Sequence, residues 1–143
     1  PDILKALGEF DLDPCAPKIR PWPVAKRHLT IDDDGLSREW EGRVWLNPPF
    51  GRFVGGWLKR LADHGNGIAL VAARTETEWF YDYIWRRASA ICFLEGRPHF
   101  YRTDGARGKA NSGAPICLAA FGQENVRAIE RCGLGVFVPG WTV

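Results

Sequence analysis

An amide, two prolines and an aromatic ring follow one another at Asn47, Pro48, Pro49 and Phe50, directly after the apolar residues 44–46. Each proline lacks a backbone N–H and fixes φ, and a residue before proline is held in an extended conformation. A strand over 43–46 therefore has to end here. A Pro-Pro pair alone is typical of a rigid loop. The whole arrangement is more specific, because the Asn47 amide oxygen and the Pro48 carbonyl are left as acceptors that no neighbouring strand uses.

Two such acceptors suit a primary amino group on an aromatic ring, because together they can bind both of its hydrogens. Holding the hydrogens out of the ring plane draws the nitrogen lone pair out of conjugation and makes the nitrogen nucleophilic. The same two dipoles stabilise the positive charge that develops during attack. Phe50 is placed to stack on the ring. The motif therefore predicts alkylation of the exocyclic amine of a base that has left the duplex.

This chemistry needs no general base if the electrophile is already activated as a sulfonium. We therefore expect S-adenosylmethionine as the methyl donor. Nitrogen, methyl carbon and sulfur would lie nearly in line, at an approach of about 3–3.5 Å. Positioning is then the main task of the protein.

The elements that must hold this motif alternate along the chain. Gly8, Gly65 and Gly133 are each expected to end a helix. The unbroken apolar run 68–73 is typical of a central strand covered on both faces. A Thr75–Glu78 capping box is expected at one helix start. Between 17 and 42 the chain is polar and irregular. We expect helices over 2–7, 54–64, 76–88 and 124–132, and strands over 10–13, 43–46, 68–73, 90–94, 114–121 and 134–138.

This order predicts an α/β protein, a three-layer α/β/α sandwich whose middle strands are parallel, in a single domain over 1–143. Ligands of such sheets bind outside the carboxyl ends of the strands. Asp13 and Asn47 both stand at expected strand ends, so we expect them on one rim.

Composition limits the alternatives. The 143 residues are 45% hydrophobic and 25% charged, which is ordinary for a globular domain. No apolar run approaches the ~18 residues of a membrane span, and no signal peptide is evident, so we expect no membrane partner and a cytoplasmic location. The four cysteines are far apart and no histidines lie at metal spacing, so we expect no metal. Because the sequence contains no methionine, we expect further residues upstream of Pro1.

Four segments together resemble a known family: FDLDPCAP (10–17), HLTIDDDGLSREWEGRVWLNPPFG (28–51), GIALVAARTETEWF (67–80) and FLEGRPHF (93–100). They are similar to the phage-type DNA N-6-adenine methyltransferases, the phage Dam family, over about residues 1–122. The resemblance implies an abbreviated Rossmann-like methyltransferase fold that uses S-adenosylmethionine on double-stranded DNA. It also implies a phage- or prophage-encoded protein in the cytoplasm of a bacterial host.

The resemblance assigns roles to the opening motif. Asn47, Pro48, Pro49 and Phe50 match the catalytic motif that holds and stacks the flipped adenine, and Asn47 also borders the cofactor. Asp13, with Pro14 and Cys15, resembles the cofactor motif, in which the carboxylate helps to hold the methionine part.

The resemblance implies a binding role for two further segments, and each has a structural alternative. Asp33 and Asp34 resemble the acidic segment that contacts the adenosine half of the cofactor, although an aspartate-rich turn is also a common solvated loop. Arg74 and Thr75 follow the central strand, where a substrate contact and a plain helix cap are both compatible with the sequence.

The sequence departs from the usual cofactor loop, which continues into a Gly-x-Gly turn. Here Ala16, Pro17 and Lys18 follow Cys15. The cofactor carboxylate must then be held differently, and the family leads us to expect a Thr-Pro element upstream of Pro1. The interval from Asp13 to Asn47 is also short for two strand–helix units, so we expect an abbreviated sheet.

DNA contact is expected from the basic segment 96–113, which holds only one acid, Asp104. Its cations can meet phosphates and its aromatic residues can wedge or stack where the base departs. A β-hairpin with a solvated basic tip is the alternative. A second group at Lys18, Arg20, Lys26 and Arg27 is a weaker candidate for backbone contact. The substrate-binding candidates of the segment are Arg97, Phe100, Arg102, Arg107 and Lys109.

Other functions remain compatible with the motif. Cytosine and the glutamine side chain of a protein also present amino groups to related motifs. A catalytically silent DNA-binding or protein-binding relative would keep the same fold.

Overall fold

The computed structural model describes residues 2–49, 51, 53–101, 107–111 and 113–143, with the backbone alone described for 99–101 and 107–111. The centre of the fold is strand β4 (Gly67–Ala72), whose six residues are all buried. Its side chains alternate between two apolar clusters: Ala69 and Val71 belong to one, and Ile68 and Leu70 to the other. The unbroken apolar run therefore reflects a strand with a hydrophobic core on each face.

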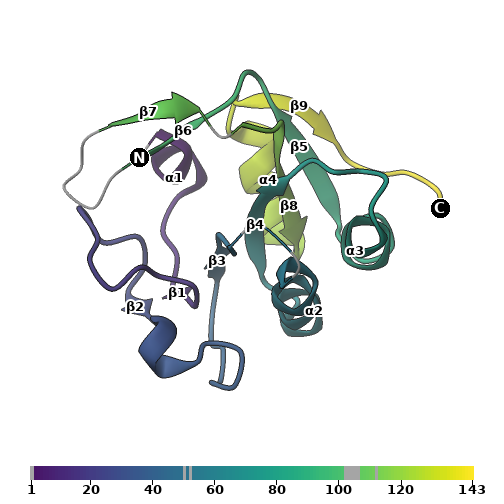
Figure 1. Ribbon diagram of the computed structural model, residues 1–143. Helices are drawn as coiled ribbons and strands as arrows, with labels where there is room; N and C mark the ends of the chain where they lie inside the picture. Colours follow the sequence, from purple (N-terminus) through teal and green to yellow (C-terminus); the bar gives the residue numbers. More distant parts are fainter. Residues whose placement is uncertain (1, 50, 52, 102–106, 112) are drawn as a thin grey trace.

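A mixed seven-stranded sheet surrounds β4 (Figure 1). On one side of β4 the neighbours are parallel to it, while on the other side β8 is antiparallel to both β4 and β5. The edge strand β9 is antiparallel to β5. In spatial order the strands are β2 (Arg27–His28), β1 (Leu12–Asp13), β3 (Val44–Leu46), β4, β8 (Ile116–Phe121), β5 (Ala90–Leu94) and β9 (Gly135–Val138).

Helices pack on both faces of this sheet. Helix α2 (Val54–His64) packs with the β3–β4 face, and its apolar stripe contributes Val54, Leu58 and Leu61 to the first cluster. It ends at Gly65, whose φ of 77° lets its N–H donate to the Leu61 carbonyl at 2.9 Å. Helices α1 (Asp2–Leu7) and α4 (Gln123–Arg131) pack against each other over the second cluster. The chain is thus an α/β protein compatible with a methyltransferase fold.

Most expected helices and strands are present, with shifts at their ends. The strand expected over 10–13 is reduced to Leu12–Asp13, and the helix expected over 76–88 is α3 (Glu78–Phe80) continued by a π-helix, η2 (Tyr81–Trp85). The irregular stretch 17–42 also contains β2 and a short 3₁₀-helix, η1 (Ile31–Asp33).

Two expectations were wrong. The middle strands are not all parallel, because the antiparallel β8 separates β4 from β5; the long segment between β5 and β8 lets the chain return in the opposite direction. The capping box expected at Thr75–Glu78 is absent, because α3 begins two residues later: Thr77 is its N-cap, makes no side-chain capping hydrogen bond, and donates its hydroxyl to the Arg74 carbonyl at 2.7 Å. A capping-type contact occurs at η1, where the Asp33 carboxylate accepts the Thr30 N–H at 2.8 Å.

The basic segment contains a β-hairpin of β6 (His99–Tyr101) and β7 (Arg107–Asn111), which pair antiparallel. The hairpin form of that segment is therefore confirmed, whereas its contact with DNA stays a prediction.

The four cysteines are free thiols: Cys92 and Cys117 are buried, and Cys15 and Cys132 are half-buried. In the part of the chain that the structure describes, no helix is long and apolar enough to cross a membrane.

Candidate active site

Three neighbouring parallel strands bring the candidate residues to one edge of the sheet. Strand β1 pairs with β3, and β3 pairs with β4, in the register Leu12 to Val44 and Leu46 to Ala69. Asp13 is the last residue of β1, and Asn47 directly follows β3. Because parallel strands end at the same edge, these residues share one rim, together with the segment that begins after β4.

Asp13 is a buried carboxylate, with 4% of its surface exposed. Its Oδ1 accepts one hydrogen bond, from the Cys15 N–H at 3.2 Å. Burial raises the pKa of Asp13 to about 7, although the Cys15 N–H and the positive charge of Arg20 oppose this shift. A buried carboxylate with a single donor has acceptor capacity to spare, so Asp13 fits a cationic ligand group.

The acidic segment approaches the Asp13–Cys15 loop closely at Gly35. A Cβ at this position would lie 2.2 Å from the Pro14 carbonyl oxygen and 3.1 Å from the Trp57 ring. Trp40 Nε1 donates to the Gly35 carbonyl at 2.8 Å and holds the segment in place. Only glycine allows this approach.

The two aspartates assigned to the cofactor differ in how they are engaged. The Asp33 carboxylate accepts hydrogen bonds from the Thr30 N–H and hydroxyl, which lower its pKa. Asp34 is exposed, adopts a left-handed φ of 51°, and accepts a hydrogen bond from the Ser37 hydroxyl at 2.8 Å. Asp33 thus has a structural role in the turn, and Asp34 is the more accessible carboxylate.

Cys15 is half-buried, and burial together with the charge of Asp13 raises the pKa of its thiol. The thiol therefore stays protonated at neutral pH and is a poor nucleophile. The clearest contribution of Cys15 to the site is the hydrogen bond that its backbone N–H donates to Asp13.

Asn47 is half-buried and Pro48 is buried, while Pro49 is exposed. Within the described ranges, no residue hydrogen-bonds to the Asn47 side-chain amide or to the Pro48 carbonyl. The two acceptors that the sequence analysis singled out are therefore available to a ligand. Phe50 lies outside the described residues.

Arg74 and Thr75 lie after β4, at the same edge. The Arg74 carbonyl accepts from the Thr77 N–H at 3.1 Å and from its hydroxyl, which forms a tight turn before α3. The Thr75 carbonyl accepts from Trp85 Nε1 at 3.1 Å. These contacts use backbone atoms, so the exposed Arg74 side chain is left at the surface.

The DNA-contact candidates are only partly described. Arg97 is exposed after β5. Phe100 lies in β6, and Arg107 and Lys109 lie in β7, with the backbone alone described, while Arg102 lies outside the described residues.

Sequence reasoning missed the role of Arg43, a buried cation that directly precedes β3 at the other edge of the sheet. Its Nη1 and Nη2 donate to the carbonyls of Glu9 and Leu7, each at 2.9 Å, and its Nε donates to Asn125 Oδ1 at 2.7 Å. Nothing in the sequence around Arg43 signals that role, because all three acceptors lie far away along the chain.

The residues at the rim fit S-adenosylmethionine in one testable respect. The cofactor carries an ammonium group, and Asp13 is a buried carboxylate whose one donor among the described residues is the Cys15 N–H. Among the described residues, no three His, Cys, Asp or Glu side chains are arranged to hold a metal ion.

A comparison with protein families gives one match. The model described as DNA N-6-adenine-methyltransferase (Dam) matches residues 2–131, and this range includes the whole rim. No curated protein and no solved structure matches the chain.

Proposed function

We propose a function from one established premise: this chain belongs to the DNA N-6-adenine-methyltransferase (Dam) family. The reaction is transfer of a methyl group from S-adenosylmethionine to the exocyclic amino group of an adenine in double-stranded DNA. The adenine leaves the duplex to reach the site, because the amino group is hydrogen-bonded inside the helix.

The observation that carries the proposal is the pair of acceptors after β3. Within the described ranges the Asn47 amide and the Pro48 carbonyl have no hydrogen-bond partner, although Asn47 is half-buried and Pro48 is buried. Two acceptors that lie side by side at a strand end, without a described protein partner, are open to a ligand. An amino group with two hydrogens fits a pair of acceptors.

At this pair, the Asn47 oxygen and the Pro48 carbonyl orient the adenine nitrogen and hold its hydrogens out of the ring plane. Their dipoles then stabilise the positive charge that develops on nitrogen. Phe50 stacks on the purine. No described side chain has to accept the proton while the bond forms, since the leaving proton becomes acidic once the nitrogen is positively charged.

When bound, S-adenosylmethionine would supply a methyl group activated by its positively charged sulfur: the carbon–sulfur bond would break as the nitrogen–carbon bond forms, and neutral S-adenosylhomocysteine would leave. Asp13 holds the ammonium of its methionine part, with Pro14 and Cys15 shaping the loop around it. Asp34 and, less directly, Asp33 face the adenosine half, and Asn47 separates the cofactor from the base.

The remaining assignments concern DNA. Arg97, Arg102, Arg107 and Lys109 contact phosphates, and Phe100 stacks where the base departs. Arg74 and Thr75 border the base. The fold that serves this chemistry is a single domain over 1–143, an abbreviated three-layer, Rossmann-like methyltransferase.

The test is to incubate the purified protein with duplex DNA and S-adenosylmethionine, digest the DNA and identify the methylated nucleoside. We expect N6-methyl-2′-deoxyadenosine. Methylcytosine would move the target to cytosine. Methylation of added protein instead of DNA would indicate a glutamine target, and no methylation with DNA binding retained would indicate a silent relative.

The matched control uses two half-buried asparagines at opposite edges of the sheet. Asn47→Ala should remove methylation while leaving the fold intact. Asn66→Ala removes an acceptor of Asn125 Nδ2, a contact of 2.8 Å, and should retain the rate per folded molecule. A wild-type rate in Asn47→Ala would overturn the mechanism.

A further inference from the structure

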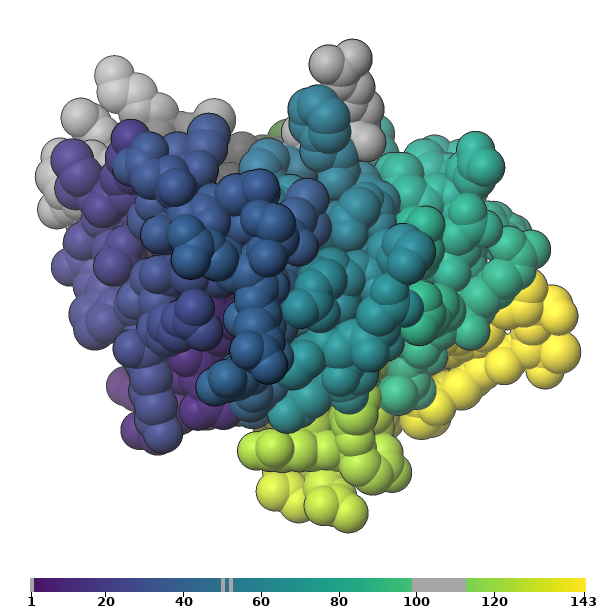
Figure 2. Space-filling model, turned by 90° about the horizontal axis from the view of Figure 1, so that it is seen from below, coloured from purple at the N-terminus to yellow at the C-terminus, as the bar shows by residue number. Residues whose placement is uncertain are grey.

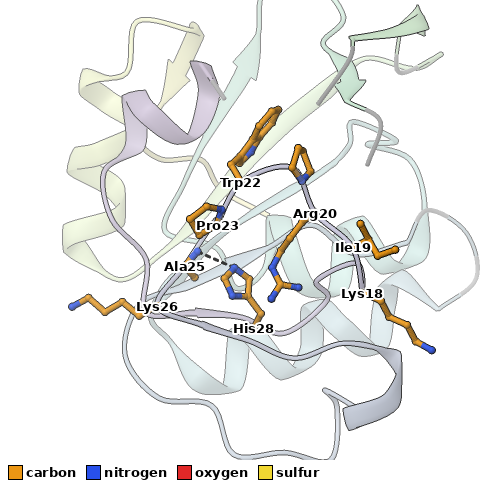
Figure 3. A pocket seen from close by; sticks show the side chains of 9 residues that line it. Lys18, Ile19, Arg20, Trp22, Pro23, Ala25, Lys26 and His28 are labelled. Atoms are coloured by element: carbon orange, nitrogen blue, oxygen red, sulfur yellow. Dashed lines mark hydrogen bonds between the residues drawn. The ribbon is translucent and has the colours of Figure 1, made fainter. Parts of the chain in front are cut away.

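The loop that joins β1 to β2 encloses a concave site that the methyl-transfer mechanism does not use. The concavity has a volume of about 620 Å³ and is open to solvent. Figure 3 shows the Arg20 guanidinium lying inside the arch beside the His28 ring, with Lys18 and Lys26 on its two sides. In place of a crossover helix, this edge of the sheet carries a basic hollow.

The loop is held in shape by contacts that do not involve a ligand. His28 Nε2 accepts the N–H groups of Val24 and Ala25 at 3.1 and 3.3 Å. Burial, with a contribution from the charge of Arg20, lowers the pKa of His28, so Nε2 stays an acceptor at neutral pH. At the other end of the loop, Arg20 Nη1 donates to the Pro17 carbonyl at 2.9 Å.

Prolines reinforce this shape. Pro17, Pro21 and Pro23 restrict the backbone of a loop that has neither a helix nor a strand between Pro14 and Lys26. A loop that is ordered before binding loses little entropy when a ligand arrives.

The charge of the loop is positive throughout. No acid occurs from Pro14 to Ile31. Lys18 pairs with Asp32 at 3.0 Å and Lys26 with Asp11 at 3.6 Å, but these pairs are largely exposed and therefore weak. Arg20 is half-buried, and within the described ranges no carboxylate oxygen lies within 4 Å of it.

We propose that the β1–β2 loop is a preformed cradle for a backbone phosphate of the DNA, with Arg20 as the central contact and Lys18 and Lys26 on its rims. The inference rests on the proposed function and adds a second contact surface to it. It assigns DNA binding to an ordered part of the sheet edge as well as to the basic hairpin.

The features of the site favour a phosphate over the carboxylate of the cofactor. The concavity is wide and open, and its cations are spread over both rims, which suits a polyanion that passes across it. The guanidinium presents several donors in a fixed plane, and phosphate oxygens accept such donors in pairs.

Figure 2 shows the N-terminal part of the chain, which includes this loop, gathered on the side of the molecule opposite the C-terminal strand.

The experiment measures binding of a fluorescent duplex to the full chain as a function of salt, for wild type and Arg20→Gln. We expect roughly tenfold weaker binding in Arg20→Gln, since a charged hydrogen bond is lost. The slope of log K against log salt should fall by about 1, and equally for unrelated sequences, because a phosphate contact carries no sequence information. Arg20→Lys should retain part of the affinity.

The matched control is Arg86→Gln, which removes an exposed guanidinium paired with Asp82 at 2.9 Å. In Figure 1 its helical segment, continuous with α3, lies on the other side of the molecule from the β1–β2 loop. Arg86→Gln should leave affinity and salt slope unchanged. If Arg20→Gln unfolds, the double variant Lys18→Gln/Lys26→Gln provides the same test.

Three outcomes would overturn the inference. One is unchanged DNA affinity and slope in folded Arg20→Gln. Another is an Arg20→Gln variant that binds DNA as the wild type does but binds S-adenosylmethionine more weakly in calorimetry without DNA. Arg20 would then hold the cofactor carboxylate. The third is a wild-type protein that binds no duplex.

Failure of the proposed function gives a different result. If wild-type protein binds duplex DNA but its products contain no methyladenine, the methylation proposal fails, and the Arg20 comparison still decides the cradle.

Discussion

The two edges of the parallel strands each bury a charged side chain, but they surround it differently. At the amino-terminal edge, the Arg43 side chain makes three hydrogen bonds, to the Leu7 and Glu9 carbonyls and to Asn125, and its guanidinium lies 4.3 Å from the centre of the Phe10 ring. At the carboxyl-terminal edge, Asp13 accepts a single N–H from the part of the chain that the structure describes, that of Cys15. Both side chains are at least 93% buried, so exposure does not distinguish them.

The difference lies in hydrogen-bond saturation. A buried charge whose partners all come from the protein stabilises the fold and has nothing left to offer a ligand. A buried charge with spare capacity is unfavourable in the free protein and becomes favourable when a ligand supplies the missing partner. The Arg43 edge therefore holds the chain together, and the rim of Asp13 and Asn47 is prepared for chemistry.

The largest effect expected from this comparison is on stability, at Arg43. Arg43→Ala removes the donor of two buried acceptors, the Leu7 carbonyl and Asn125 Oδ1, and of the Glu9 carbonyl, and we expect a loss of about 3–5 kcal/mol in the free energy of unfolding, measured in urea. Methyl transfer per folded molecule should be unchanged. Arg86→Ala, at an exposed ion pair, should lose less than about 1 kcal/mol. Equal stability of these two variants would contradict the structural role of the Arg43 edge.

Asn47 should show the opposite pattern, with lost turnover and retained stability. Asn47→Ala removes one of the two acceptors, and we expect kcat to fall by about 10²–10³, as for other single groups that stabilise charge in a transition state. Asn47→Asp keeps acceptor oxygens and should lose less. Turnover of DNA and a thermal unfolding scan measure both quantities. If Asn47→Ala loses more stability than turnover, the amide belongs to the core.

A third change tests how closely the acidic segment must approach the rim. Gly35→Ala would place a Cβ 2.2 Å from the Pro14 carbonyl oxygen, so one of the two segments has to move. We expect a loss of about 1–3 kcal/mol in unfolding free energy, typical of overpacking, together with weaker cofactor binding. Calorimetric titration with S-adenosylmethionine measures the second effect. Gly56→Ala, where no atom lies within 4 Å of the added Cβ, is the control.

The sequence predicted the elements whose signals are local. The apolar run of β4, the stripe of α2 and the stop at Gly65 all depend on residues within a few turns, and each element is present. The rim followed from two such signals together with the rule for parallel strands, and Asp13 and Asn47 do lie at neighbouring strand ends.

What the sequence did not predict depends on distant contacts. The antiparallel insertion of β8 is decided by how the chain returns after the hairpin, which no local pattern records. Arg43 is buried because Leu7, Glu9 and Asn125 converge on it from distant positions. The expected capping box failed because α3 begins after Thr77 and not after Thr75, behind a turn in which Thr77 donates to the Arg74 carbonyl.

The last prediction concerns the pH dependence of Asp13, where the comparison is sharpest. The folded protein raises the pKa of Asp13 to about 7, above its ordinary value of 3.8, so the native state binds the proton more tightly than the unfolded state. The contribution of Asp13 to stability is therefore full below about pH 4 and declines as pH rises to about 7, by about 1.4 kcal/mol per pH unit. The ammonium of the cofactor favours the ionised form, so its affinity should rise with pH up to about 7, with proton release on binding. Asp13→Asn should remove both dependences in urea unfolding and in calorimetry. A cofactor affinity that is flat from pH 5.5 to 8 in the wild type would show that Asp13, like Arg43, is satisfied by the protein alone.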